Sequence, residues 1–236
     1  MRIGIPNRSS FLHIGAISQC VFSGILPQHL YHPAKLFYKL DGYNLLLCRC
    51  SELCKLFLQR DIDLIFVGDD YAKEYLPNAE YEKISFSFLK VYFALLCSDI
   101  YNQRSRFDKI FTKFPVMAAE YLQKWSIGYN QIEAVSGASE CFACSVSNSA
   151  AFDVICSGIT QQENGLSIIR NDDLLGCSWY FSQNLFPDSL RTAISNQNLF
   201  NRILDYYKSV LNNHSDATKI EVQSILGSIN KGDDNV

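Results

Sequence analysis

The sequence lacks runs of lysine or arginine, long uninterrupted apolar stretches, and histidines spaced as a catalytic or metal-binding pair. Proteins that bind nucleic-acid backbones usually carry a basic stripe, and the net charge here is -3, so we expect no nucleic-acid partner. The longest apolar stretch, Phe88 to Cys97, is interrupted by Lys90 and is far shorter than the ~20 residues of a membrane span. The amino terminus has the pattern of a strand rather than of a signal peptide. We therefore expect a cytoplasmic protein with no membrane partner.

A second CxxC motif is also missing. The nine cysteines include one such pair, Cys141 and Cys144, whereas a zinc site normally needs two pairs or added histidines. Cysteine is among the most frequently buried residue types, and an odd count in a chain of this kind favours reduced thiols. We therefore expect thiols packed mainly as small hydrophobic side chains, and no metal ion held by protein ligands alone.

The sequence does contain enough apolar residues for a large core. With 48% apolar and 19% charged residues over 236 positions, it can form one large or two small domains. Short apolar runs alternate with segments of helical periodicity, which predicts an α/β fold with a mainly parallel sheet. The expected strands are 2–6, 43–50, 62–67, 86–97, 110–113, 131–135, 152–156 and 174–182.

The most informative segment is DVICSGITQQENGL, residues 153–166. A short buried strand ends there in a turn of small and hydroxyl-bearing residues, Ser157, Gly158 and Thr160, whose backbone N–H groups can surround one phosphate. Asp153, near the carboxyl end of the strand, could accept hydrogen bonds from sugar hydroxyls. An ordinary strand-to-helix turn is the alternative interpretation, because short Gly/Ser/Thr motifs are common.

Five further segments precede this loop in a characteristic order. The chain opens with RIGIPN, and it then has an arginine three residues before an acid, a strand ending in glycine and two acids, a Lys-Phe-Pro turn, and SGASE. Together with the loop, these segments resemble the ATP phosphoribosyltransferase family, which catalyses the first step of histidine biosynthesis. The resemblance extends from about Arg2 to about Leu211 and rests on these residues: Arg49, Glu52, 63–70, 113–115, 136–140 and 153–160.

The resemblance implies a fold of two α/β lobes, similar to periplasmic binding proteins, with a cleft between the lobes. The first lobe would be discontinuous and contain residues 1–90 and 179–211. The second lobe, 91–178, would carry the phosphoribosyl-binding loop. The polar tail, 212–236, is too short for the allosteric domain of the family's long form, so the chain resembles the short form. The family's short form works with a synthetase-like regulatory subunit, and a homo-oligomer is expected.

The resemblance also implies a glycosyltransferase reaction. A purine ring nitrogen of ATP, or of a related purine nucleotide, would attack phosphoribosyl pyrophosphate and release pyrophosphate, with Mg²⁺ as cofactor. Carried over residue by residue, the implied catalytic residues are Asp153, Glu140 and Arg49. The residues implied in binding phosphoribosyl pyrophosphate are Asp153, Ser157, Gly158, Ile159 and Thr160. Those implied in nucleotide binding are Arg8, Arg49, Gly68, Asp69 and Asp70.

Two departures from the family pattern keep alternatives open. The family's Lys-Gly-Arg turn after the first strand is replaced here by Asn7, Arg8, Ser9 and Ser10, and the first acid of its Asp-Ala-Ile-x-Asp segment is Ser149. Arginine can bind a phosphate through two hydrogen bonds, so Arg8 is a partial substitute for the lost lysine. The alternatives to an ATP-using transferase are a transferase with a related acceptor in a specialised nucleoside pathway, and a catalytically weak binding or regulatory homologue.

Overall fold

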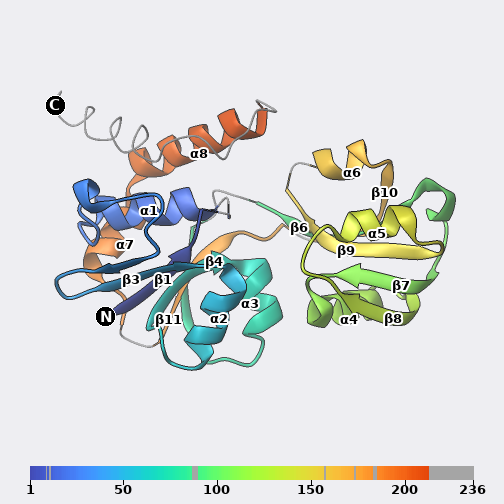
Figure 1. The fold of residues 1–236 in the computed structure, drawn as a ribbon, viewed down its shortest axis with the longest axis horizontal. Coiled ribbons are helices and arrows are strands. Elements are labelled where there is room, and N and C mark those ends of the chain that lie inside the picture. The colour runs from blue at the N-terminus through green and yellow to red at the C-terminus, as the bar shows by residue number, and fades with distance from the viewer. Residues whose placement is uncertain are drawn as a thin grey trace. The chain divides into compact units, whose positions relative to one another are not determined.

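The computed structural model describes residues 1–8, 10, 12–86, 90–156, 158–172, 174–182 and 185–212, without the side chains of 159 and 206–212. The predicted polar tail therefore lies outside the described residues, apart from Asn212. The chain divides into two compact units: unit 1 comprises 1–89 and 176–236, and unit 2 comprises 90–175. Each unit contains one mixed sheet with helices on both faces, so the predicted two-lobed α/β fold is confirmed (Figure 1).

Unit 1 has a six-stranded sheet with the order β2-β3-β1-β4-β11-β5. Strands β1, β3 and β4 are parallel, and β2, β11 and β5 are antiparallel to their neighbours. The elements are β1 (Arg2–Pro6), α1 (Leu12–Phe22), a 3-10 turn (Gln28–Leu30), β2 (Phe37–Lys39), β3 (Asn44–Cys48), α2 (Cys50–Leu58), β4 (Leu64–Gly68), α3 (Asp69–Tyr75), β5 (Glu82–Ser85), β11 (Cys177–Phe181), α7 (Asp188–Ser195) and α8 (Gln197–Asn212).

The helices of unit 1 cover opposite faces of its sheet because the chain reverses direction around β1. The connection from β1 to β3 runs in one direction along the sheet, and the connection from β3 to β4 runs in the opposite direction. Because both connections are right-handed crossovers, their helices lie on opposite faces of the sheet. Helices α1, α7 and α8 contact one another on one face, and α2 and α3 pair on the other (Figure 1). The indole of Trp179 packs on Phe66 at 5.1 Å and donates a hydrogen bond to Gln19 at 2.7 Å.

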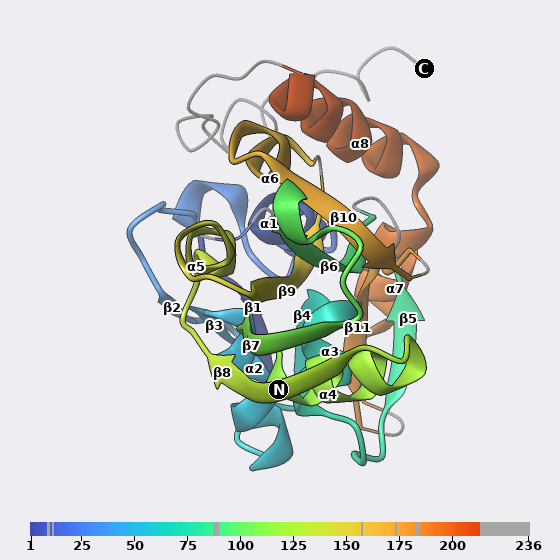
Figure 2. The same cartoon turned by 90° about the vertical axis from the view of Figure 1, so that its right-hand side faces the viewer.

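Unit 2 has a five-stranded sheet with the order β10-β6-β9-β7-β8 (Figure 2). Strands β9, β7 and β8 are parallel, whereas β6 and β10 run antiparallel to their neighbours. The elements are β6 (Tyr92–Ser98), a 3-10 turn (Asp99–Tyr101), β7 (Arg106–Thr112), α4 (Pro115–Lys124), β8 (Gly128–Ala134), α5 (Ser139–Ser145), β9 (Ser149–Ile155), α6 (Ile159–Glu163) and β10 (Leu166–Asn171). The expected long strand 86–97 is wrong, since β5 ends at Ser85 and β6 begins at Tyr92.

Alternating side chains of β9 line two different cores in unit 2. Phe152 packs in an aromatic cluster with Phe93, at a ring distance of 5.1 Å, and with side chains of α4. On the opposite face, Ala151 and Ile155 belong to a core of small and aliphatic residues against α5. Because strand side chains alternate, Asp153 falls on the α5 face between these two residues. A carboxylate is thus placed within a buried strand, where it needs polar partners.

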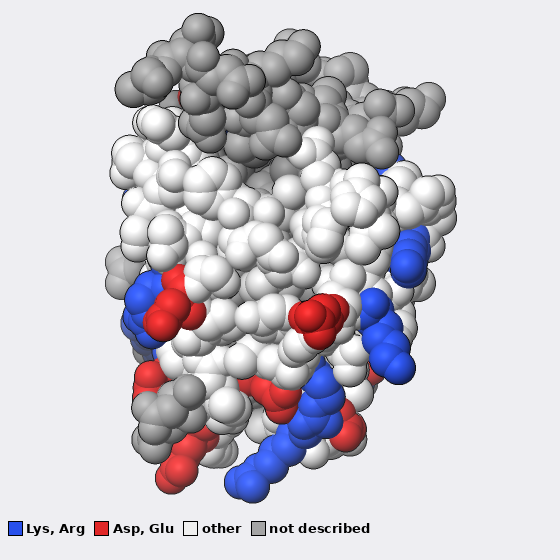
Figure 3. All heavy atoms as spheres, turned by 90° about the vertical axis from the view of Figure 1, so that its left-hand side faces the viewer, with Lys and Arg blue, Asp and Glu red and all other residues white. Residues whose placement is uncertain are grey.

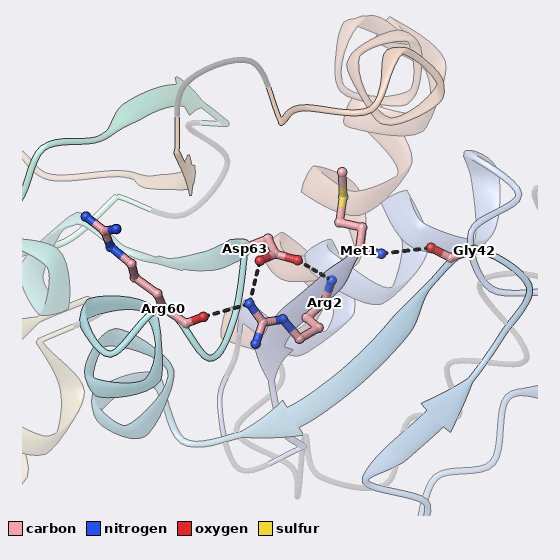
Figure 4. Close-up of polar contacts among 5 residues, drawn as sticks. All are labelled: Met1, Arg2, Gly42, Arg60 and Asp63. Carbon is pink, nitrogen blue, oxygen red and sulfur yellow. Dashed lines mark hydrogen bonds and ion pairs between the residues drawn. The ribbon is translucent and has the colours of Figure 1, made fainter.

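At the amino end of unit 1, an ion pair ties β1 to the start of β4 (Figure 4). The Arg2 guanidinium donates hydrogen bonds to Asp63 at 2.8 Å and to the Arg60 carbonyl at 2.6 Å, and the Arg2 backbone N–H donates to the second Asp63 oxygen at 2.8 Å. Burial alone would raise the pKa of Asp63, but these hydrogen bonds and the Arg2 charge hold that pKa below its ordinary value.

The face of the molecule seen in Figure 3 is largely uncharged, and its charged side chains of both signs lie close to one another.

We expect the Asp63→Asn variant to have a thermal midpoint about 1–3 °C below that of the wild type at pH 7, because a partly exposed ion pair contributes little. A carboxyl group with a lowered folded-state pKa stabilises the fold above its unfolded pKa of about 3.9, and this contribution is lost as the pH falls through the folded pKa. The difference between variant and wild type should therefore shrink as the pH falls below about 3.9 toward the lowered pKa of Asp63. Melting curves from pH 7 to pH 3 would measure it. The control is Asp61→Asn; an equal loss there at pH 7 would contradict the role of the Arg2 pair.

None of the helices in the described part of the chain is sufficiently long and apolar to span a bilayer.

Candidate active site

The predicted site residues of unit 1 follow the carboxyl ends of its three parallel strands. In α/β sheets, ligands bind where the strand order reverses, because the loops after neighbouring strands then diverge to opposite faces. In unit 1 this point is the carboxyl end of β1, between β3 and β4. Arg8 follows β1, Arg49 follows β3, and Gly68 ends β4. The Asn7 backbone N–H donates to the Cys48 carbonyl at 2.9 Å, which joins the first two of these loops.

A buried histidine holds the first loop of unit 1 in place. His13 bonds through Nδ1 to the Pro6 carbonyl at 2.8 Å and through Nε2 to the Tyr31 hydroxyl at 3.1 Å. Burial lowers the pKa of His13 and the Arg8 charge lowers it further, against the Pro6 hydrogen bond, which raises it. Since a carbonyl can only accept, Nδ1 carries the proton of the neutral ring and Nε2 accepts from Tyr31. This role could not be predicted from the sequence, because His13 fits the pattern of a helix.

Arg49 and the acidic turn after β4 differ in how freely they can meet a ligand. The Arg49 side chain is exposed where α2 begins. Asp69 accepts hydrogen bonds from Ser178 at 2.8 Å and from Tyr180 at 2.5 Å, so its carboxylate fixes the neighbouring strand β11. Burial, followed by the Asp69 charge, raises the pKa of Tyr180, which therefore stays protonated as a donor. Asp70 is buried, and a Cβ at Gly68 would collide with its carboxylate, so a larger residue at position 68 would displace that carboxylate.

Unit 2 has its own reversal point, at the carboxyl end of β7 between β8 and β9. Four polar side chains meet near it. The Ser139 hydroxyl donates to Asp153 at 2.5 Å and lies 3.4 Å from the Glu140 carboxylate. The Lys113 ammonium lies 3.4 Å from the other Asp153 oxygen, which also accepts from the Val154 backbone N–H at 2.7 Å. Asp153 is only 5% exposed, whereas Lys113 is partly open to solvent, so an anion can reach the cation.

A strained turn positions Ser139 beneath β9. Ala138, which precedes α5, has a φ of 52°, in the left-handed region that a residue with a Cβ rarely adopts. Such strain clusters at functional sites, where the surrounding structure enforces it. Ser139 is fully buried, so its hydroxyl depends on the Asp153 carboxylate as its acceptor. Sequence reasoning missed Ser139, and it treated Lys113 as part of a motif only.

The predicted phosphate loop is described except for Ser157, which lies outside the described residues. Gly158 has a φ of 74°, where glycine is strongly favoured, and α6 begins at the next residue, Ile159. Thr160 is exposed, and its carbonyl accepts a hydrogen bond from the Asn164 side chain at 2.7 Å. The sequence between Lys124 and Arg170 contains neither lysine nor arginine. Lys113 lies 3.4 Å from Asp153, which is on the strand that leads into this loop.

Among the described residues, no three His, Cys, Asp or Glu side chains converge as ligands for a metal ion. Mg²⁺ is usually bound through one or two carboxylates together with substrate phosphates and water. Asp153 and Glu140, which share the Ser139 hydroxyl, supply carboxylates of that kind. Their number and chemistry therefore fit a magnesium ion whose remaining ligands come from a phosphorylated substrate.

Comparisons with known proteins identify a family and a shared fold. The family model HisG, described as ATP phosphoribosyltransferase, matches residues 49–196. A comparison with curated proteins finds no significant match. Among solved structures, the ATP phosphoribosyl transferase (HisG:HisZ) complex from Thermotoga maritima has a TM-score of 0.68 at 14% identity, covering 87% of this chain and 99% of that chain. XAC2383 from Xanthomonas citri bound to ATP has a TM-score of 0.55 at 8% identity, covering 100% and 98%. At these identities the structural matches show a shared fold.

Proposed function

The chain belongs to the ATP phosphoribosyltransferase family, and we propose that it transfers the phosphoribosyl group of phosphoribosyl pyrophosphate to a purine ring nitrogen of ATP, releasing pyrophosphate. The observation that carries this proposal is the cluster of Asp153, Ser139, Glu140 and Lys113, in which Asp153 belongs to the strand that leads into the Gly158 turn. It combines carboxylates for a sugar with a cation for a phosphate. The family match includes all of these residues.

The proposed reaction breaks the bond between C1 of the ribose and the pyrophosphate oxygen and forms a bond between C1 and the purine nitrogen. Positive charge develops on C1 and the ribose ring oxygen as the pyrophosphate leaves. A fixed carboxylate in a water-poor site stabilises such charge more strongly than water does. Asp153 meets this requirement, because burial and three donors hold it in place before substrate arrives. Glu140, whose carboxylate lies 3.4 Å from the Ser139 hydroxyl, faces the ribose hydroxyls in this proposal.

The 5′-phosphate would bind at the turn between β9 and α6. Gly158 allows backbone N–H groups to approach a phosphate closely, and the Thr160 hydroxyl, on an exposed residue, is available to donate to it. Lys113 adds a compact positive charge from the end of β7. Ser157 and Ile159 complete this loop in the proposal. Mg²⁺ would neutralise the pyrophosphate as it leaves, with Asp153 and Glu140 as its protein carboxylates.

In unit 1, we assign nucleotide binding to Arg8 and Arg49, which follow β1 and β3 at the reversal point. Guanidinium groups bind phosphates through two parallel hydrogen bonds, so either side chain suits a triphosphate. Gly68, Asp69 and Asp70 shape the turn on the other side of β1. Arg49 and this turn lie inside the family match, whereas Arg8 lies before it.

The proposed setting is the first step of histidine biosynthesis in the cytoplasm. The structural neighbour from Thermotoga maritima is a complex of two different proteins, HisG and HisZ. We propose that this chain likewise binds a synthetase-like regulatory subunit and that its own copies self-associate. Sedimentation of the chain alone and with such a subunit would test both associations, and a monomer under both conditions would refute them.

A second candidate is a protein that binds the nucleotide or the sugar phosphate and turns over slowly or with a different acceptor. It is favoured by Ser149, which stands where the family has an acid. Ser149 is fully buried and its hydroxyl donates to the Val146 carbonyl at 2.7 Å, so this position is used within the fold. The altered turn at Arg8 also favours this second candidate.

The deciding experiment is incubation of the pure chain with phosphoribosyl pyrophosphate, Mg²⁺ and a panel of purine nucleotides, followed by measurement of released pyrophosphate. Release with ATP alone supports the proposed reaction, and chelation of Mg²⁺ should abolish it. Release with another nucleotide identifies a different acceptor. Binding of phosphoribosyl pyrophosphate without release under any condition would refute the transferase and support the second candidate.

We expect Thr160→Val to weaken the affinity for phosphoribosyl pyrophosphate by about 1.5–3 kcal/mol, the contribution of a hydrogen bond to a charged group. Valine keeps the shape of threonine and lacks only the hydroxyl donor, and Thr160 is exposed, so the fold should tolerate the change. Isothermal titration calorimetry would measure the affinity. The matched control is Thr192→Val on α7 of unit 1. Equal affinities of the Thr160 variant and the wild type would place the phosphate elsewhere.

A further inference from the structure

Two exposed thiols share the short helix that carries Ser139 and Glu140. Of the nine cysteines, five are buried, Cys48 is partly buried, and Cys141, Cys144 and Cys156 are exposed. Cys141 and Cys144 lie three residues apart on α5, so they are neighbours on one side of the helix. The pKa of Cys144 is raised by burial and then by the charges of Cys141 and Glu140.

Closing a disulfide between these two thiols requires a change in the helix. Side chains three residues apart on a helix have Cβ atoms about 5–6 Å apart. A disulfide needs a Cβ separation of about 3.8 Å. The bond is therefore within reach, but only if the turn of α5 between Cys141 and Cys144 contracts. Ser139 and Glu140 form the turn immediately before it, so their positions depend on the shape of this turn.

The Cys144 thiol also connects α5 with the phosphate loop. Its S–H donates to the Asn164 carbonyl at 3.5 Å. The Asn164 side chain in turn donates to the Thr160 carbonyl at 2.7 Å. A disulfide has no S–H donor, so oxidation would remove the first of these bonds while contracting the helix. This pair of thiols is therefore coupled to both ends of the proposed sugar-phosphate site. One end is the Ser139 contact with Asp153, and the other is the α6 turn.

We propose that Cys141 and Cys144 form a redox modification site, which a disulfide-class oxidant such as glutathione disulfide closes into an intrahelical disulfide that weakens the sugar-phosphate site. One cysteine thiolate attacks a sulfur of the oxidant and releases the first thiol; the second cysteine thiolate then attacks the mixed disulfide and releases the second. The two protein thiols lose two protons and two electrons in total, and the oxidant is reduced to two thiols. The effect on substrate rests on the proposed function.

The test titrates the full-length chain with glutathione redox buffers and maps the cysteines by mass spectrometry. Trypsin leaves all three exposed cysteines in one peptide, 125–170, so chymotrypsin is used, which cuts after Phe142 and Phe152. We expect a linked pair of peptides containing Cys141 and Cys144, with two hydrogen atoms fewer than the reduced pair. The Cys156→Ser variant should form the same link. Only mixed disulfides, or links to Cys156, at excess oxidant would overturn the proposal.

Two further measurements test the structural consequence. Amide hydrogen exchange of residues 139–145 should speed up on oxidation and return to its original rate after reduction. The affinity for phosphoribosyl pyrophosphate should fall about fivefold, the equivalent of one neutral hydrogen bond. Cys141→Ser and Cys144→Ser should show neither change. A disulfide that leaves hydrogen exchange unaltered would overturn the coupling. If phosphoribosyl pyrophosphate bound in neither redox state, the proposed function would be refuted. The peptide mapping and the hydrogen exchange would still show whether the disulfide forms and whether it changes α5.

Discussion

Replacement of Asp153 by asparagine is expected to lower the turnover number about 10²–10³-fold, the effect of removing one charge-stabilising group from a preorganised site. The carboxylate faces positive charge that develops only in the transition state, so the loss should appear mainly in kcat and less in KM. The fold should be preserved. Asparagine has the same shape, and the Ser139 hydroxyl, which donates to Asp153 at 2.5 Å, can instead accept from the asparagine amide.

Steady-state kinetics and thermal unfolding of the same samples would measure both effects. The matched control is Asp172→Asn, which also removes a carboxylate paired with a lysine in unit 2, since Asp172 lies 2.9 Å from Lys124. That variant should keep its turnover within about twofold, because Asp172 lies outside the proposed site. A parallel loss of rate and stability in Asp153→Asn would mean that the carboxylate serves the fold rather than the reaction.

The Phe93→Ala variant is expected to lose about 3–5 kcal/mol of unfolding free energy, the usual cost of removing a buried aromatic ring. Phe93 is fully buried on β6, and its ring centroid lies 5.1 Å from Phe152, 5.3 Å from Phe114 and 5.4 Å from Tyr121. These three partners come from β9, from the residue before α4 and from α4 itself. The cavity would therefore separate the helix from the sheet that carries Asp153.

Denaturant unfolding followed by tryptophan fluorescence would measure this loss in unit 2 specifically. The chain has two tryptophans, Trp125 in unit 2 and Trp179 in unit 1. In a Trp179→Phe background, the signal of Trp125 alone reports the unit that contains Phe93. Ile100→Ala is the control, since Ile100 belongs to the same unit, is 76% exposed, and its truncation should cost less than about 1 kcal/mol. Similar midpoints for the two variants would contradict the packing described for Phe93.

The α/β class and the family could be predicted from the sequence, whereas the strand directions could not. Apolar runs such as 62–67 and 152–156 have the composition and length of buried strands, and both are strands, β4 and β9. The expectation of a mainly parallel arrangement was wrong in detail. β11 inserts antiparallel between β4 and β5, and β6 and β10 also run antiparallel to their neighbours. Pairing partners far apart in the chain leave no local signal.

In the candidate site, likewise, residues close together in the sequence could be predicted, whereas contacts between distant residues could not. Asp153 and Gly158 belong to one continuous segment, so the carboxylate and the turn could be recognised together. The Lys113 contact joins residues 40 positions apart, and the Ser139 contact joins residues 14 positions apart. The left-handed turn at Ala138 also had no marker, because glycine or asparagine is the usual sign of that conformation. Only the folded chain reveals these partners.

The position of β11 sets the order in which the two units can be completed during synthesis. Val91 and Leu175 pair with each other at the two ends of unit 2, so this unit is one continuous insertion whose ends meet. Unit 1 lacks β11, the strand between β4 and β5, until residues 177–181 have left the ribosome. At about 5–20 residues per second, the edge of β4 stays unpaired for roughly 5–20 seconds after β5 is made. An open strand edge is a template for wrong pairing, and an inserted unit whose ends already meet lets β11 reach that edge as soon as it has been made.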